Sequence, residues 1–100
     1  RPISDFPLST RDFSFSIKNI AQYNSVISHI EKFNDENLKD SFIFDFYLNK
    51  KLAEIKVGVR LVFQSSVKTL SDEDIQKSIG KILNPIIKID GVFIPGLELK

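Results

Sequence analysis

The sequence contains no cysteine and no methionine. Without cysteine the chain can form no disulfide, no thiolate metal site and no cysteine nucleophile, and this fits a reducing compartment without proving one. A chain that has no methionine and begins with Arg1 is expected to be a piece of a longer protein.

Excess charge and long apolar runs are also missing. Fourteen basic and thirteen acidic residues leave a net charge of only +1, so attraction of nucleic acid by the whole molecule is excluded and any such binding needs a local patch. No segment resembles a signal peptide or a membrane-spanning helix. At 100 residues, of which 42% are hydrophobic, the chain is expected to form one soluble globular domain.

Hydrophobic periodicity predicts six elements along the chain. Alternating apolar residues predict strands, and apolar residues spaced by three and four predict helices. Pro85 is expected to kink or end the second helix because it cannot donate a helical hydrogen bond. In order, the prediction is a strand over 11–17, a helix over 20–33, strands over 38–48 and 54–63, a helix from Ser71, and a short strand over 91–94.

This order predicts an α+β ferredoxin-like fold, the split βαβ sandwich, with a four-stranded antiparallel sheet and two helices on one face. The domain is expected to span 11–94, after an irregular lead-in over 1–10 and before a tail over 95–100.

Strand alternation also predicts which side chains face the helices and which lie on the opposite, open face of the sheet. In "SFIFDFYLN" strict alternation turns Phe42, Phe44, Phe46 and Leu48 toward the core. The open face is then predicted to carry Asp12, Ser14, Ser16, Ile43, Asp45, Tyr47, Lys56, Gly58, Arg60 and Val62.

Three motifs in order resemble a known family. They are Pro7, Arg11, Asp12, Ser14 and Phe15; then Phe44, Asp45 and Tyr47; then Thr69, Leu70, Ser71, Asp72 and Glu73. Together with the closing "DGVFI" they span about residues 6–94 and resemble the C-terminal ferredoxin-fold anticodon-binding domain of the phenylalanyl-tRNA synthetase β subunit.

The resemblance implies a non-catalytic domain that recognises the anticodon stem-loop of phenylalanine tRNA. It assigns anticodon contacts to Asp45 and Tyr47, and both suit this role because aromatic rings stack on bases and carboxylates accept hydrogen bonds from base edges. The basic residues of the same hairpin would serve phosphates, with the serines of the first strand on the same face. The RNA-binding prediction is therefore Asp45, Tyr47, Ser14, Ser16, Lys56, Arg60, Lys50 and Lys51.

The resemblance also implies properties of a longer parent enzyme. No cofactor is expected in this domain, whereas the parent, an ATP-dependent phenylalanine–tRNA ligase, would use ATP and magnesium. The expected partners are the tRNA, the remainder of the β chain and the α subunit, with no membrane. A cytoplasmic location is expected, with mitochondria or another organelle as the alternative.

Structural roles compete with these functional ones. Asp12 is expected to form a structural ion pair or accept a hydrogen bond near Arg11, and Asp45 could equally pair with Arg60 across the hairpin. His29 is expected to be a solvated helix residue, because no second histidine or cysteine accompanies it. The acidic run Asp72, Glu73 and Asp74 is explained by capping of a helix N-terminus.

Two rival functions share this topology, a small-molecule-sensing module and a protein-interaction domain. Glycine-rich strand-to-helix turns would favour the sensor, but "IKNIAQ" contains no glycine. A flat apolar open face would favour protein interaction, and Asp45, Lys56 and Arg60 speak against it. No nucleophile, base and orienting group occur together, and no glycine-rich loop cradles phosphate.

Overall fold

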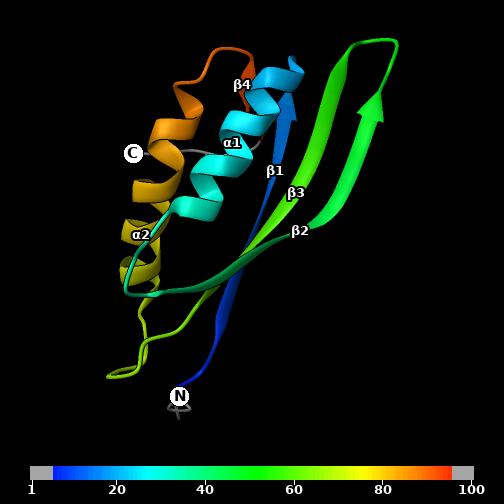
Figure 1. Ribbon diagram of the computed structural model, residues 1–100. Coiled ribbons are helices and arrows are strands. Elements are labelled where there is room, and N and C mark those ends of the chain that lie inside the picture. The colour runs from blue at the N-terminus through cyan, green and yellow to red at the C-terminus, as the bar shows by residue number, and fades with distance from the viewer. Residues whose placement is uncertain (1–5, 96–100) are drawn as a thin grey trace.

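A computed structural model describes residues 6–95, and it has the predicted succession of elements (Figure 1). The strands occur in the order β2-β3-β1-β4, every neighbouring pair is antiparallel, and both helices cover one face. The predicted ferredoxin-like α+β fold is confirmed. The elements are β1 (Ser9–Ile17), α1 (Ile20–Lys32), β2 (Leu38–Asn49), β3 (Glu54–Phe63), α2 (Asp72–Ile87) and β4 (Val92–Phe93).

Some boundaries differ from the predicted ones. Strand β1 begins at Ser9, inside the predicted lead-in, because Ser9 and Thr10 pair with the end of β3. Helix α2 does not end at Pro85 but continues to Ile87. A proline this close to the helix end removes one hydrogen bond, to the carbonyl of the solvent-exposed Lys81. Positions 1–5 of the lead-in and 96–100 of the tail lie outside the described residues.

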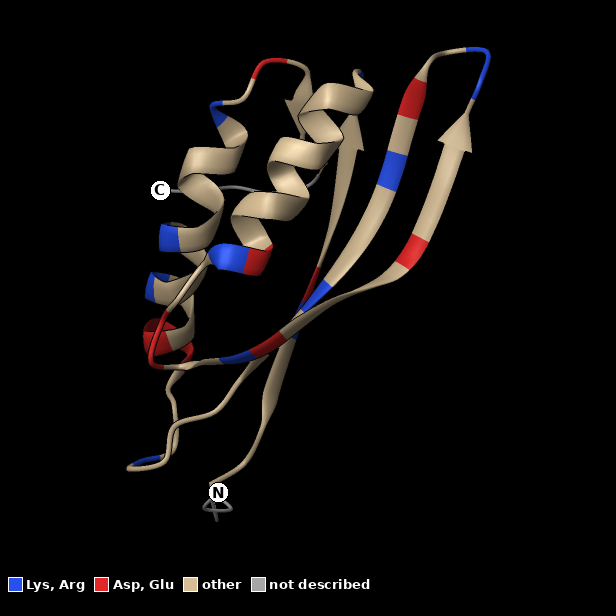
Figure 2. Ribbon diagram, viewed as in Figure 1, with Lys and Arg blue, Asp and Glu red and all other residues tan. Residues whose placement is uncertain are grey.

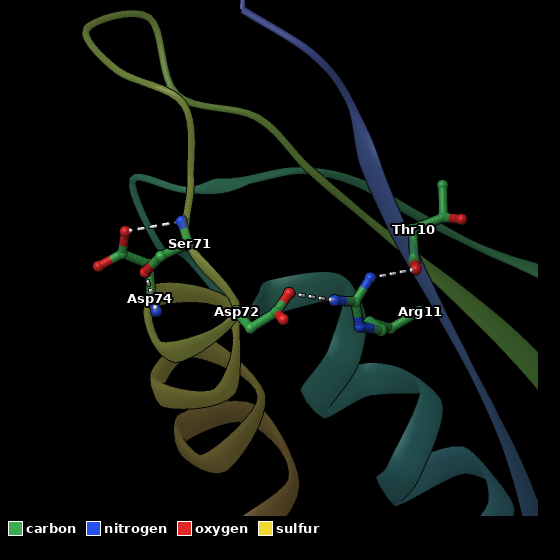
Figure 3. A network of polar contacts seen from close by, with 5 residues as sticks. All are labelled: Thr10, Arg11, Ser71, Asp72 and Asp74. Atoms are coloured by element: carbon green, nitrogen blue, oxygen red, sulfur yellow. Dashed lines mark hydrogen bonds and ion pairs between the residues drawn. The ribbon is translucent and has the colours of Figure 1, made fainter.

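Local side-chain contacts fix the start of each helix. The Asn19 side chain accepts a hydrogen bond from the backbone N–H of Ala21 at the start of α1. Helix α2 begins with a capping box, in which Ser71 and Asp74 each accept from the other's backbone N–H (Figure 3). These bonds from Ser71 hold the pKa of Asp74 below its usual value of 3.8. The predicted capping role of the acidic run is thereby confirmed.

Two longer-range contacts tie the helices to their neighbours. Arg11 on β1 reaches Asp72 at 3.4 Å and also donates to the carbonyl of Thr10 (Figure 3). His29 is half-buried, and its Nε2 lies 3.0 Å from the carbonyl oxygen of Ile82 on α2. The prediction that His29 is solvated is therefore wrong, because the ring bridges the two helices.

The core lies between the helices and the two central strands, and β2 contributes little to it. Phe46 and Leu48 face the helix side as predicted but remain 51% and 44% exposed, because the β2–β3 hairpin extends away from the helices (Figure 1). The Phe46 ring still meets Tyr23 of α1 edge-on, with 5.6 Å between the ring centroids. The expectation that β2 fills the core is thus wrong. The buried apolar side chains are Phe15, Ile17, Val26, Ile30, Ile55, Val57, Val59, Leu61, Phe63, Leu70, Ile75, Ile79, Ile82, Leu83, Ile86 and Val92.

A β-bulge at Phe44 reverses the faces predicted for the residues of β2 just before Asp45. Asp45 pairs with Gly58, but Ile43 pairs with Val59 and Phe42 with Arg60, so Phe44 has no partner of its own on β3. Ile43 consequently turns to the helix side, whereas Phe42 lies on the open face. The contacts of the Phe44 ring place it there as well, so strict alternation predicted all three residues wrongly.

Candidate nucleic-acid interface

Three cross-strand rows organise the open face of the sheet. Directly paired residues of neighbouring strands share a face, so each row runs from β2 across β3 to β1. The rows are Tyr47, Lys56 and Ser16; Asp45, Gly58 and Ser14; and Phe42, Arg60 and Asp12. The register thus brings six of the eight predicted RNA-binding residues to one face.

A cleft of about 270 Å³ lies over the first two rows. Asp45 at this cleft is exposed, and its side chain has no hydrogen bond or ion pair with any residue in 6–95. Its carboxylate is therefore open to an incoming donor. The alternative pairing of Asp45 with Arg60 is not found. Among the residues that line the cleft are Ser14, Ser16, Asp45, Lys56, Gly58 and Pro95.

Tyr47 and three lysines extend this surface toward the hairpin tip. Tyr47 is 57% exposed, in the row next to Asp45. Lys50 and Lys51 lie in the turn between β2 and β3, away from the open-face rows, and the tip carries basic charge (Figure 2). Over the described part of the chain, none of Lys50, Lys51 and Lys56 forms an ion pair with a carboxylate. These ammonium groups are free to contact phosphate.

Ser16 has an internal partner that the sequence patterns did not reveal. Its Oγ donates to Glu54 at 2.5 Å, and Lys18 Nζ donates to the same carboxylate at 2.8 Å. Glu54 is only 6% exposed, and the bonds from Lys18 and then Ser16 hold its pKa below the usual 4.5. No motif indicated Glu54, because its pairing depends on the register between β1 and β3.

Arg60 is likewise held by a partner on the sheet. Its Nε and Nη2 donate to the two carboxylate oxygens of Asp12 at 2.8 and 2.9 Å. This bidentate pair lowers the pKa of Asp12 and raises that of Arg60. The structural role predicted for Asp12 is confirmed, but the partner is Arg60, whereas Arg11 turns to α2.

Two further clefts lie away from the open face. One, of about 300 Å³, lies beside the start of α2, and its Asp35 and Asp74 are paired with Lys81 and Lys68. The other, of about 270 Å³, is an apolar groove between α1 and β2. Within 6–95, no three carboxylate or imidazole side chains gather as metal ligands would. No helix in that range is long and apolar enough to cross a membrane.

Comparison with known proteins gives consistent matches. A chloroplastic phenylalanine–tRNA ligase β subunit of Porphyra purpurea is 34% identical over 88% of this chain. The corresponding β subunits of Rickettsia conorii and Campylobacter jejuni are 35% identical over 73% and 33% identical over 100% of the chain. The aligned segments make up only 9–12% of these relatives' lengths, so the chain corresponds to a small part of each.

A family profile described as "Ferredoxin-fold anticodon binding domain" matches residues 4–91, which is most of the chain. The match includes all of β1, α1, β2, β3 and α2, and therefore every residue of the three open-face rows. The resemblance carried by the three sequence motifs is confirmed, and the chain belongs to the ferredoxin-fold anticodon-binding domain family.

Proposed function

We propose that the open face of the sheet binds the anticodon stem-loop of phenylalanine tRNA. One observation carries the proposal: the cleft joins the unpaired carboxylate of Asp45 to Ser14 and Lys56, with the exposed Tyr47 in the next row. Bases in RNA loops are unstacked and can be read along their edges, which a duplex does not allow. The open face offers such a loop an aromatic ring for stacking, a carboxylate that accepts hydrogen bonds and an ammonium group for phosphate.

Each group has a distinct chemical role in this proposal. Tyr47 stacks on a base, and Asp45 accepts hydrogen bonds from the amino or imino groups of a base edge. Lys50, Lys51 and Lys56 neutralise phosphates, which positions the RNA without reading its sequence. Ser16 supports the floor of the cleft through Glu54.

We further propose that the chain is part of a phenylalanine–tRNA ligase β chain. In that enzyme the remainder of the β chain and the α subunit would carry out aminoacylation with ATP and magnesium, outside this domain. The curated relatives include chloroplast and bacterial proteins. The choice between cytoplasm and organelle therefore stays a prediction.

The test is a titration of the chain with a phenylalanine anticodon hairpin and with the same hairpin carrying a scrambled anticodon. Tyr47→Ala should weaken binding of the true hairpin by about 1–3 kcal/mol, the usual value of one stacked base. Phe46→Ala is the matched control, since Phe46 is an exposed aromatic residue on the other face of the same strand.

Salt dependence separates phosphate contacts from base contacts in the same titration. Each lysine that contacts phosphate contributes about 0.7 to the slope of log K against log salt for single strands. Lys50→Gln should therefore reduce that slope, whereas Tyr47→Ala should leave it unchanged. Equal affinity for the two hairpins, or equal losses in Tyr47→Ala and Phe46→Ala, would refute anticodon recognition by this face.

A further inference from the structure

The bulge places the ring of Phe44 at the border of the cleft, a position that strict alternation assigned to the core. A Cβ built on Gly58 would lie 2.8 Å from Cζ of Phe44 and 3.1 and 3.2 Å from its two Cε atoms. The tip of the ring therefore points down onto Gly58. Since Gly58 also lines the cleft, the ring stands at its edge.

Arg60 supports this ring from one side. The guanidinium carbon lies 5.1 Å from the centroid of the Phe44 ring, and Asp12 fixes the guanidinium through two hydrogen bonds. The Phe44 side chain nevertheless stays 46% exposed. A large apolar surface that is held in place but not covered is what a stacking platform requires.

The separation between the backbone rows of Tyr47 and Phe44 suits the thickness of one stacked base. Tyr47 lies in the row of Lys56, and Phe44 lies over Gly58, two residues further along β3. Two residues of an antiparallel strand span about 6.8 Å. This is about twice the ~3.4 Å step between stacked bases in a duplex. Asp45 occupies the row of Gly58, within reach of the edge of a base in that space.

We propose that Phe44 is a second base-stacking residue, and that an unpaired base of an RNA loop inserts between Phe44 and Tyr47 with its edge toward Asp45. This inference rests on the proposed RNA-binding function and goes beyond it by naming the residue and the mode of stacking. Arg60 acts here as a positioning residue, since its charge is neutralised by Asp12 and its guanidinium holds the ring.

The experiment uses anticodon hairpins in which 2-aminopurine replaces one loop base at a time, because stacking quenches its fluorescence. Binding is measured for wild type, Phe44→Leu, Tyr47→Ala and the matched control Phe46→Leu, with unmodified hairpin as competitor. Phe44→Leu keeps an apolar cover over Gly58 but removes the ring. We expect at least a fivefold loss of affinity and partial loss of quenching at the same loop position that Tyr47→Ala affects. Phe46→Leu should bind like wild type.

The outcomes separate this inference from the proposed function. Phe44→Leu binding within twofold of wild type, while Tyr47→Ala binds weakly, would overturn the stacking role of Phe44 alone. A wild-type chain that binds neither hairpin would overturn both proposals. Ring-proton NMR shifts of Phe44 in the wild-type titration provide a readout that does not depend on the folding of a variant. Upfield movement supports stacking, and unmoved signals contradict it.

Discussion

Substituting Gly58 tests the placement of Phe44 without RNA. In Gly58→Ala the new Cβ would lie 2.8 Å from Cζ of Phe44, about 0.7 Å inside the shortest favourable carbon contact of roughly 3.5 Å. The three nearest heavy atoms all belong to this one ring, and the backbone of Gly58 does not require a left-handed conformation. The substitution therefore displaces Phe44 and little else.

Two opposing effects set the size of the change in stability. Alanine in a strand interior stabilises the folded chain by roughly 0.5–1 kcal/mol relative to glycine, because an alanine loses less backbone entropy on folding. Displacing a half-exposed ring costs about 1 kcal/mol of stability, at the low end of the range for overpacking, because the ring can move toward solvent. Gly58→Ala alone should therefore leave the free energy of unfolding nearly unchanged.

A double-mutant cycle with Phe44→Ala isolates the contact. Once the ring is absent, Gly58→Ala should stabilise the chain by roughly 0.5–1 kcal/mol, which gives a coupling energy of about 1 kcal/mol. Urea unfolding of the four proteins resolves this, since 1 kcal/mol moves the midpoint by roughly 0.3–1 M at ordinary m-values. Equal stabilisation by Gly58→Ala in both backgrounds would show that the ring does not rest on Gly58.

Two more predictions concern the hairpin turn and the buried carboxylate. Ala53 has φ of 50°, where a Cβ is unfavourable, so Ala53→Gly should raise the free energy of unfolding by up to about 1 kcal/mol, and no rise in Tm would contradict this. The pKa of Glu54 is lowered by Lys18 and Ser16, so the stability it adds is present above pH 4.5 and is lost as pH falls through its folded pKa. Glu54→Gln should therefore be less stable than wild type at pH 7, with the difference shrinking toward pH 3 in urea titrations. A difference independent of pH would refute the ionic role of Glu54.

The sequence was sufficient to predict features whose physical causes are local. The capping box of α2 depends on Ser71 and Asp74, three residues apart, and its buried stripe depends on apolar residues at helical spacing. Alternation along β1 and β3 is unambiguous because polar residues mark one face of each strand. The order of the elements could therefore be predicted. The fold could be predicted from it, because few topologies are compatible with this order.

The faces of β2 could not be predicted by the same reasoning. Phe42, Ile43 and Phe44 are consecutive apolar residues, so a shift by one residue at this point costs little burial and leaves no mark in the hydrophobic pattern. The bulge at Phe44 inserts such a shift. One signal was available: Gly58 is the only residue of β3 without a side chain, which fits the close approach of a bulky ring.

The pairing of charged residues was missed for a related reason. Sequence patterns placed Asp12, Asp45 and Arg60 on one face, but the choice of partner depends on register across three strands. Observed pairing of Arg60 with Asp12 leaves Asp45 without a partner in the described chain. Under the proposed function this choice matters, because a carboxylate already bound to arginine would be a poorer acceptor for a base.

Three of the proposed RNA-binding side chains lie on a strand that contributes little to the core, which makes their roles testable by mutation. Strand β2 supplies Asp45, Tyr47 and Phe44, yet none of its side chains is fully buried. The core is formed instead by β1, β3, Val92 of β4, the helices and their connections. Substitutions at exposed positions away from buried contacts usually change stability by only about 0.5 kcal/mol. A loss of RNA binding in a β2 variant can therefore be assigned to the open face, provided that its unfolding midpoint stays close to that of wild type.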